Sequence, residues 1–356
     1  MTRKHNFSAG PAVLPVSVLD ELRAQILDLH GSGVGLMEIS HRSQTFGDIV
    51  DSAMARIRRV LSLPDTHTVL LLQGGASTQF LMIPANLLQG GHADYLNTGT
   101  WSTKAIKEAR RFGSVSVPFD GAEVGYRALP ASWEDSDDVV YSHYTSNNTI
   151  HGTQFHHVPG VSGMLACDAS SDIASRAMDG GRFDVLYAGA QKNLGPSGVT
   201  LVCLSERAMA AAKDADVPTM LDYRVHADKG SLFNTPNTLG IFVLERVLAW
   251  VEEQGLDALA ARNERKASSL YELLDGSDFW QPHAETSCRS MMNVTWRLRD
   301  PELEAPLLAE AEEMGFSGIR GHRSVGGLRA SIYNACPEDS VAALVAFLKE
   351  FERTHG

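Results

Sequence analysis

The chain has 356 residues, of which 44% are hydrophobic and 21% charged, and its formal net charge is −12. This composition is that of a folded globular protein, and the length suits one large α/β domain with a smaller one. An acidic chain lacks the extended basic face that nucleic acids and anionic membranes require, so neither is expected as a partner. No apolar run approaches the ~20 residues of a membrane span, and no apolar leader precedes residue 15.

The four cysteines lie far apart in the chain and form no C-x-x-C pair. Such spacing favours reduced, packed thiols over disulfides or a metal centre. We therefore expect a cytoplasmic protein that holds no metal.

Apolar, β-branched runs alternate with helical patterns over the first two thirds of the chain. The runs predicted as strands are 68–73, 93–97, 114–119, 138–143, 164–169, 184–190 and 199–205. Their apolarity is continuous, which is typical of a mostly parallel sheet covered by helices on both faces.

From about Thr238 the pattern changes to helical stretches that run to about Leu274. A strand over 292–298, a helix over 301–314, a strand over 327–333 and a closing helix from Pro337 follow. These elements predict a second, smaller α/β domain, joined to the first by a long helix. We expect an N-terminal segment (1–20) that packs on the small domain (256–356), and a large domain between them (21–255).

Lys192 follows the predicted strand 184–190, in the stretch YAGAQKNLGPSG. Ligands of open parallel sheets bind beyond the carboxyl ends of the strands, and the small neighbouring residues leave room for a flat group. A lysine used for Schiff-base chemistry needs such a crowded, water-poor place. Taken alone, a surface lysine on a loop is the more common meaning of this pattern.

Two glycines and the triplet Ala76-Ser77-Thr78 follow the predicted strand 68–73. Backbone N–H groups and hydroxyls in this arrangement can hold a phosphate at a helix N-terminus. The spacing is not that of a P-loop, and a plain helix cap explains it equally well.

An acid and an aromatic residue occupy corresponding positions after two other strands. Asp168 closes an apolar strand, where a carboxylate can pair with the ring nitrogen of pyridoxal phosphate. Trp101 can stack on a flat ring. Individually, a helix-capping acid and a core tryptophan are the more common roles. The order phosphate loop, aromatic, acid and lysine is that of the aminotransferase-like pyridoxal phosphate fold.

The chain also resembles the phosphoserine aminotransferase family from residue 6 to near its end. The motifs that carry the resemblance are NFSAGPAVLP, SHRS, TIHGTQ, YAGAQKNLGPSG, SLFNTPNT and GHRSVGGLRASIYNACP. The resemblance implies fold type I, with a large pyridoxal phosphate domain, and transfer of an amino group between glutamate and 3-phosphohydroxypyruvate to give phosphoserine and 2-oxoglutarate. It also allows the analogous four-carbon phosphorylated substrate of pyridoxine synthesis.

By this resemblance Lys192 is the catalytic lysine that binds pyridoxal phosphate. The implied cofactor contacts are Ala76, Ser77, Trp101, Thr149, Asp168, Gln191, Asn234 and Thr235. Asn234 and Thr235 match residues that reach the cofactor phosphate from a neighbouring subunit, so a homodimer with shared active sites is expected.

Substrate recognition follows from charge as well as from the resemblance. The dipeptide His-Arg occurs at 41–42 and at 322–323, in polar loops of an acidic chain, and guanidinium groups bind carboxylates and phosphates through two hydrogen bonds. By the resemblance Arg329 is the clamp for the substrate α-carboxylate. His41, Arg42, His322 and Arg323 are then expected at the substrate phosphate or the glutamate side chain.

Two positions depart from part of the family. Ser77 stands where some members carry an arginine, and Ala9 where some carry a serine. Both departures bear on how tightly phosphate is held.

Two alternatives remain open from the sequence. Another fold-type-I enzyme, such as a cysteine desulfurase or an aminotransferase for small substrates, would use the same lysine, and Cys336 is the only late candidate for a reactive thiol. A phosphometabolite-binding protein without catalysis is the alternative from a different class.

Overall fold

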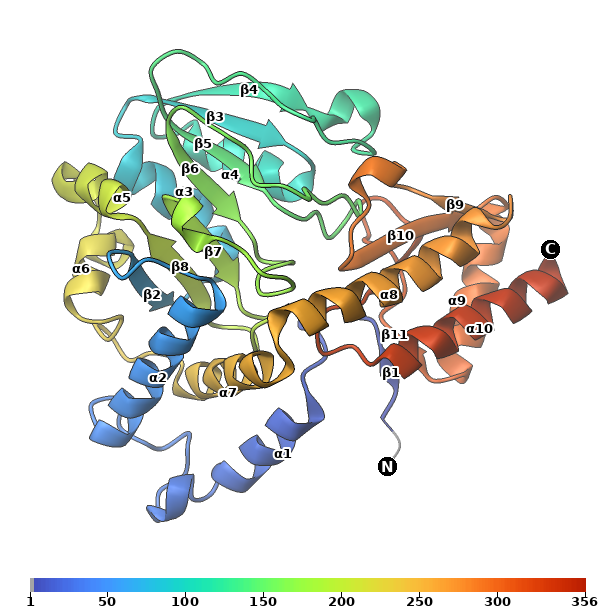
Figure 1. The fold of residues 1–356 in the computed structure, drawn as a ribbon, viewed down its shortest axis with the longest axis horizontal. Coiled ribbons are helices and arrows are strands. Elements are labelled where there is room, and N and C mark those ends of the chain that lie inside the picture. The colour runs from blue at the N-terminus through green and yellow to red at the C-terminus, as the bar shows by residue number, and fades with distance from the viewer. Residues whose placement is uncertain (1–2) are drawn as a thin grey trace.

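The computed structural model describes residues 3–356, so the first two residues of the expected N-terminal segment lie outside the described residues. Figure 1 shows two α/β parts, a larger sheet at the upper left and a smaller one at the right. Among the residues described, no helix combines the length and apolarity needed to cross a bilayer.

The larger part is built on a seven-stranded sheet with the order β2-β8-β7-β6-β5-β3-β4. Its strands are β2 (Thr68–Leu72), β3 (His92–Asn97), β4 (Ser114–Asp120), β5 (Val139–Thr145), β6 (Met164–Asp168), β7 (Val185–Gly189) and β8 (Thr200–Leu204). All neighbours pair in parallel except β8, which runs antiparallel to both β2 and β7. The predicted mostly parallel sheet is thus confirmed, and each of its strands was predicted within two residues.

Both faces of this sheet are covered, because successive side chains of a strand point to opposite sides. In β2, Val69 and Leu71 join one hydrophobic core, and Leu70 and Leu72 join another. The first core contains residues of α1 (Val16–Gln25), α2 (Gln44–Val60) and α7 (Thr238–Gln254). The second contains residues of α3 (Gly75–Leu87), α4 (Thr100–Ala109), α5 (Glu206–Ala211) and α6 (Tyr223–Asp228). Such double coverage explains the continuous apolarity of the strands.

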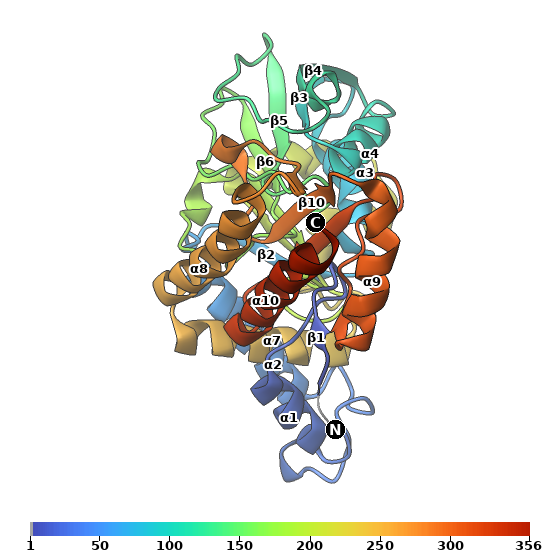
Figure 2. The ribbon, with the colours of Figure 1, turned by 90° about the vertical axis from the view of Figure 1, so that its right-hand side faces the viewer.

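The smaller part has a three-stranded antiparallel sheet in the order β12-β10-β9. Its elements are α8 (Leu256–Asp275), β9 (Trp280–Pro282), β10 (Asn293–Leu298), α9 (Glu304–Glu313), β12 (Leu328–Ser331) and α10 (Glu338–His355). Figure 2 shows α8, α10 and α9 in front of β10, and their apolar residues form a third core with Trp296. The strand β9 was not predicted, because three residues carry too little pattern.

Short 3-10 turns complete the secondary structure of the described chain. They are η1 (Leu29–Gly31), η2 (Gly121–Val124), η3 (Gly180–Arg182), η4 (Ala212–Asp214), η5 (Thr219–Leu221), η6 (Thr286–Cys288) and η7 (Pro301–Leu303).

The connection between the two parts differs from the single long helix that was expected. The helix α7 ends at Gln254 and α8 begins at Leu256, because Gly255 has φ of 77°, which an α-helix cannot contain. The helix α7 packs against α2 in the large part, whereas α8 packs against α10 in the small part. A division of the chain at residue 255 stays a prediction.

The start of the chain contacts both parts. The strand β1 (His5–Asn6) pairs in parallel with β11 (Phe316–Ser317), and Phe7 is fully buried in the small core. A few residues later, α1 packs on α7 of the large part.

One lysine is buried within the small part. Lys266 of α8 is 2% exposed, and its ammonium donates to the carbonyls of Ile332 (2.8 Å), Tyr333 (2.8 Å) and Cys336 (3.2 Å). Burial lowers the pKa of Lys266 to about 8. The lysine thus fixes the loop between β12 and α10.

Replacing this lysine is expected to destabilise the protein. Lys266→Met removes the ammonium donor from three buried carbonyls, of which Tyr333 O keeps a bond from Cys336 N at 2.9 Å, and should lower the free energy of unfolding by about 2 kcal/mol at pH 7. Urea unfolding of the variant and of Lys349→Met, which removes an exposed lysine of α10, measures the difference. Equal stability of the two variants would contradict this role of Lys266.

Candidate active site

The residues expected at the site come from the carboxyl ends of neighbouring strands. Asp168 is the last residue of β6, Lys192 lies three residues beyond β7, and Thr149 lies four beyond β5. Trp101 is the second residue of α4, just after β3. In Figure 1 the arrowheads of these strands point toward the small part, so the four residues face the junction of the two parts.

Lys192 is the centre of this group. Its Nζ donates to Thr149 Oγ1 at 2.7 Å and lies 5.9 Å from the centroid of the Trp101 ring. Burial lowers the pKa of Lys192 to about 8, against the attraction of Asp168 and with the repulsion of Arg329. A substantial fraction of the amine is therefore neutral near physiological pH, as a nucleophile or a base requires.

Asp168 is buried beside the lysine. Its Oδ1 accepts a hydrogen bond from Ser170 N at 2.9 Å, within a tight turn. Burial raises the pKa of Asp168, and the positive charge of Lys192 opposes that shift. The side chain thus closes a turn and caps no helix.

The helix α3 begins at the same edge of the sheet. Gly74 and Gly75 have φ of 91° and 70°, and a Cβ added at Gly75 would meet nothing within 4 Å. Ala76 N lies 3.6 Å from the position of a Cβ built on Gly189, so the helix N-terminus adjoins the end of β7. Ser77 is exposed in the first turn. This helix N-terminus presents free N–H groups to open space, which suits an anion.

Arg329 approaches from the small part. It lies on β12, and its Nη1 donates to Thr149 O at 3.2 Å. Among the described residues, neither Arg329 Nε nor the buried Trp101 Nε1 has a hydrogen-bond partner. Burial lowers the pKa of Arg329. A buried guanidinium with a free donor is suited to an anionic ligand.

His322 and Arg323 lie near Arg329. Burial, and then the positive charges of Arg329, Arg323 and Lys104, lower the pKa of His322. Lys104 Nζ in turn lies 4.6 Å from the Trp101 ring centroid. The structure thus gathers cations around one side of the lysine.

Two residues near the site were missed from the sequence. Lys104 looked like an ordinary exposed helix lysine. Asn148 holds the turn of Thr149, because its Oδ1 accepts from the N–H groups of Ile150 (2.9 Å) and His151 (3.0 Å). The stretch SNNTIHG carried a signal for this turn, since Asn side chains commonly bond to the backbone two or three residues on.

The other residues expected to bind the cofactor are Gln191, which is next to Lys192 in the chain, and Asn234 and Thr235, which lie in the segment before α7. Gln191 adjoins the lysine, and its backbone carbonyl accepts from Ala12 N at 2.9 Å. Thr235 is exposed, with its carbonyl accepting from Gln73 Nε2 at 2.9 Å, just before α3. Asn234 is half-buried next to it.

His41 and Arg42 are not brought to the site within one chain. They precede α2, whose N-terminal end lies at the lower left in Figure 1, away from the junction of the two parts. No hydrogen bond or ion pair within residues 3–356 joins either side chain to Lys192 or Arg329.

The gathered residues fit pyridoxal phosphate. Lys192 supplies a partly neutral amine beside an indole face, Asp168 a buried carboxylate, and the start of α3 an open anion site. A flat, phosphorylated aldehyde with a basic ring nitrogen requires this combination. The fold and the site therefore define a pyridoxal phosphate enzyme.

Comparison with known families agrees with this class. The profile of the aminotransferase class-V family matches residues 4–344, and the chain belongs to that family. The phosphoserine aminotransferase of Azotobacter vinelandii is 49% identical over 359 residues, with 99% of each chain covered.

Solved structures agree as well. Phosphoserine aminotransferase from Bacillus circulans subsp. alkalophilus has a TM-score of 0.96 and 44% identity, with 99% of each chain covered. The pyridoxal phosphate-bound phosphoserine aminotransferase of Trichomonas vaginalis has a TM-score of 0.91 and 33% identity, with 98% of this chain and 100% of that chain covered. The expected fold and the expected cofactor are thereby confirmed.

The environment of Cys336 opposes the desulfurase alternative. Cys336 is 1% exposed, and burial raises the pKa of its thiol to about 11. Such a thiol stays protonated and enclosed, whereas a nucleophilic cysteine needs an accessible thiolate.

The lowered pKa of Lys192 has a measurable effect on stability. The folded cofactor-free protein binds fewer protons than the unfolded chain between pH 8 and 10.5, so its stability should rise with pH across that window. Because Lys192→Met lacks this titration, the stability of the wild type relative to the variant should rise by about 2 kcal/mol from pH 7 to pH 10.5, after allowance for partial exposure.

Urea unfolding of both cofactor-free proteins at pH 7 and pH 10.5 tests this expectation. The free energy of unfolding of the wild type, relative to that of the variant, should be higher at pH 10.5 than at pH 7. A difference that does not depend on pH would mean that Lys192 keeps an ordinary pKa.

Proposed function

We propose that this chain transfers the amino group of glutamate to 3-phosphohydroxypyruvate, giving phosphoserine and 2-oxoglutarate, as a step of serine synthesis. The observation that carries the proposal is Lys192, held at 2.7 Å from Thr149 beside a buried acid, with Arg329 bonded to the same loop. The similarity to phosphoserine aminotransferases over 99% of the chain supports the choice of substrate.

Lys192 binds the cofactor and moves protons. Bound pyridoxal phosphate supplies an electron sink that stabilises negative charge at the substrate Cα. Because its pKa is near 8, the lysine amine can take a proton from the substrate Cα and hold it for return to the reacting group. Thr149 Oγ1 orients Nζ for this transfer.

Asp168 holds the positive charge of the ring nitrogen. The carboxylate is buried, and its turn is fixed by Ser170 N, so it is preorganised and needs no rearrangement. Trp101, at the start of α4, would stack on the ring of the bound cofactor.

The N-terminus of α3 holds the cofactor phosphate. The backbone N–H groups of Ala76 and Ser77, with the Gln191 side chain, would donate to the phosphate oxygens. Asn234 and Thr235 would complete the phosphate site of the neighbouring subunit.

Substrate anions are held by the cations of the site. Arg329 binds the α-carboxylate, because its half-buried guanidinium has a buried Nε with no hydrogen-bond partner among the residues described. His322 and Arg323 bind the phosphate or the glutamate side chain from one chain, and His41 and Arg42 do so from the partner.

The position of His41 and Arg42 supports a homodimer. The segment that carries them exposes large apolar side chains, with Leu27 85% and Met37 63% exposed, and Phe233 is 41% exposed beside Asn234. Exposed apolar groups that lie along the segments expected to cross between subunits favour an interface there. Four free, buried cysteines suit the cytoplasm.

An absorbance titration of the holoenzyme tests the substrate. Phosphoserine should convert the yellow lysine-bound cofactor to the amine form. The reason is that the phosphate and the carboxylate of phosphoserine can each bind to a cationic side chain of the site. Serine, which lacks the phosphate, should need about a hundredfold higher concentration, or more. A response to cysteine with release of sulfide, and none to phosphoserine, would contradict the proposal.

Mixed dimers test the shared site. Lys192→Ala homodimers and His41→Ala/Arg42→Ala homodimers should each be nearly inactive. If His41 and Arg42 serve the partner, a mixed dimer contains one intact site and should regain about half of the wild-type activity. Activity of purified, differently tagged mixed dimers measures this, and no recovery would place both residues in their own subunit's site.

A further inference from the structure

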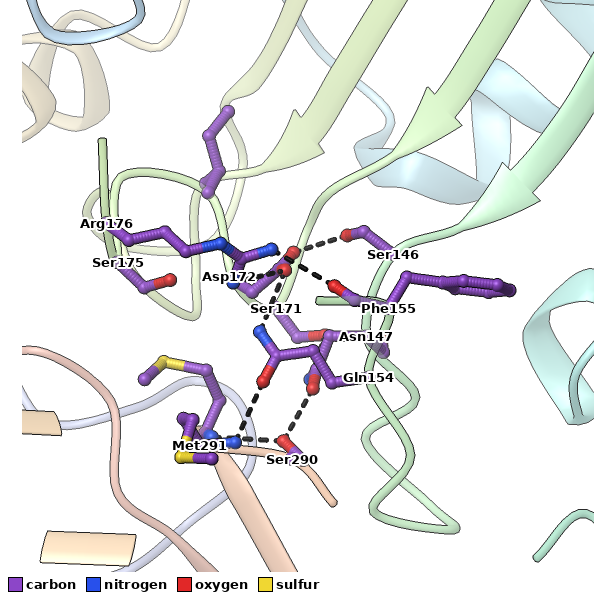
Figure 3. Close-up of polar contacts among 12 residues, drawn as sticks. Ser146, Asn147, Gln154, Phe155, Ser171, Asp172, Ser175, Arg176, Ser290 and Met291 are labelled. Atoms are coloured by element: carbon purple, nitrogen blue, oxygen red, sulfur yellow. Dashed lines mark hydrogen bonds and ion pairs between the residues drawn. The ribbon is translucent and has the colours of Figure 1, made fainter. Parts of the chain in front are cut away.

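A second buried polar cluster joins the two parts of the chain (Figure 3). It is organised by the loop 146–155, which follows β5 and carries Thr149. One side of the loop bonds to the end of β6 through Ser146 N and Asp168 O at 3.0 Å. The other side bonds to the segment before β10, through Gln154 N and Cys288 O at 2.8 Å. The loop therefore bridges the large and the small part.

Gln154 is the side chain that connects both sides. It is 1% exposed, and its Nε2 donates to Asp172 Oδ2 at 3.1 Å. Its Oε1 accepts from Met291 N at 2.9 Å. Figure 3 shows the amide between the two partners, one in the turn after β6 and one at the entry to β10.

Asp172 anchors the large-part end of this connection. It lies four residues beyond Asp168 and is buried. Its carboxylate accepts a hydrogen bond from the Ser146 hydroxyl and lies 3.5 Å from a guanidinium nitrogen of Arg176. Burying a carboxylate is costly unless donors satisfy its oxygens, so loss of any of these contacts should be unfavourable.

Asn147 makes a parallel connection one turn away. Its Nδ2 donates to Ser171 Oγ and to Asn293 Oδ1, both at 2.8 Å, and its Oδ1 accepts from Ser290 Oγ at 2.5 Å. Asn293 in turn donates to Ser331 Oγ at 2.9 Å. The connection thus continues from the turn of Asp168 through β10 to β12.

Arg329 lies at the end of this chain of contacts. On β12 it is paired with Thr295 of β10, two residues from the pair Asn293–Ser331. Its Nη1 also bonds to Thr149 O, in the loop that carries Gln154. The bridging loop therefore contacts the arginine directly and also fixes the strand on which it lies.

We propose that Gln154 is a positioning residue, which sets the place of Arg329 relative to Lys192. Gln154 touches neither of them. Its side chain links the turn after Asp168 to the entry to β10, the strand that pairs with the strand of Arg329. This link fixes the distance between Lys192 and Arg329. This inference rests on the proposed role of Arg329 as the carboxylate clamp.

A positioning residue is needed because the site combines residues of the large part of the chain with an arginine of the small part. The chain around Lys192 and Asp168 is anchored in one hydrophobic core and that around Arg329 in another. Small errors in the separation of these residues weaken a bidentate ion pair with a carboxylate. A loss of this bridge should therefore weaken carboxylate binding more than the proton transfer that Lys192 performs.

The test uses an exchange of groups between Gln154 and Asp172. Gln154→Glu keeps the size and the acceptor for Met291 N but removes the donor to Asp172. In the double variant Gln154→Glu/Asp172→Asn, the new amide donates to the new carboxylate, so the hydrogen bond and the net charge are both restored. Asn86→Asp is the control, since it removes a buried amide that donates to Met82 O and Leu221 O away from the site.

The readouts are succinate binding to each holoenzyme and the steady-state constants for glutamate. Succinate carries two carboxylates but no amino group, so it reports carboxylate binding without reaction. For Gln154→Glu we expect the succinate Kd and the glutamate KM to rise about tenfold at pH 8.5, with kcat changed less than about threefold. In the double variant, the succinate Kd and the glutamate KM should return to within about threefold of the wild-type values. In Asn86→Asp, both constants should equal those of the wild type.

The dependence on pH separates positioning from general damage. A glutamate at 154 would face Asp172 and Arg176 of the turn, His156 of its own loop, and Arg289 across the bridge. Beside Asp172 its carboxyl should bind a proton as the pH falls and then donate as the amide did. The succinate Kd of Gln154→Glu should therefore approach the wild-type value at pH 6, and that of the double variant should track the wild type throughout.

Three results would overturn the inference. The first is an unchanged succinate Kd and KM in Gln154→Glu, and the second is a double variant as impaired as the single one although both are folded by circular dichroism. The third is a wild-type holoenzyme that binds no succinate, which would remove the role of Arg329. A wild type that binds succinate but does not react with phosphoserine would instead reject the proposed function and leave this connection testable.

Discussion

The site depends on one geometric constraint, the convergence of parallel strands at one edge of a sheet. Strands that run in the same direction must end on the same side, so loops distant in sequence are brought together without any further device. In this chain β3, β5, β6 and β7 are parallel, and the aromatic, hydroxyl, acid and lysine follow them in that order. The antiparallel β8 sits between β7 and β2 and keeps β2 in the common direction, so that α3 starts at the same edge.

A second constraint is electrostatic. The chain carries a net charge of −12, and yet the ligands proposed for it are anions. Attraction must therefore be local, and Arg329, His322, Lys104 and Lys192 are close enough to influence one another. Burial, and then the repulsion of neighbouring cations, lowers the pKa of His322, and burial with the repulsion of Arg329 lowers the pKa of Lys192. An anion that enters this group relieves the repulsion, which makes binding of substrate and the proton state of the lysine interdependent.

Much of the architecture could be predicted from the sequence, because buried parallel strands leave long apolar runs. The lysine, the acid and the phosphate loop were found because each follows such a run. The bridge through Asn147 and Gln154 could not be found in this way. Its partners lie up to 146 residues apart, and amide side chains in polar loops have no periodicity that marks them as buried.

The short strands were missed for a related reason. The pairs of β1 with β11 and of β9 with β10 involve two or three residues each, and their position is set by the surrounding core rather than by local preference. The location of His41 and Arg42 illustrates another limit. Sequence motifs indicate that two residues serve one site, but not whether a single chain can bring them there.

The pairing of β1 with β11 also bears on how the protein is made. The small part needs Phe7 in its core and residues 5–6 paired with β11, but this partner strand is synthesised some 310 residues later, at Phe316–Ser317. During synthesis β1 therefore stays unpaired until almost the whole chain has left the ribosome. The large sheet, whose strands end at Leu204, can form earlier. A fragment that begins at residue 256 would lack this strand altogether.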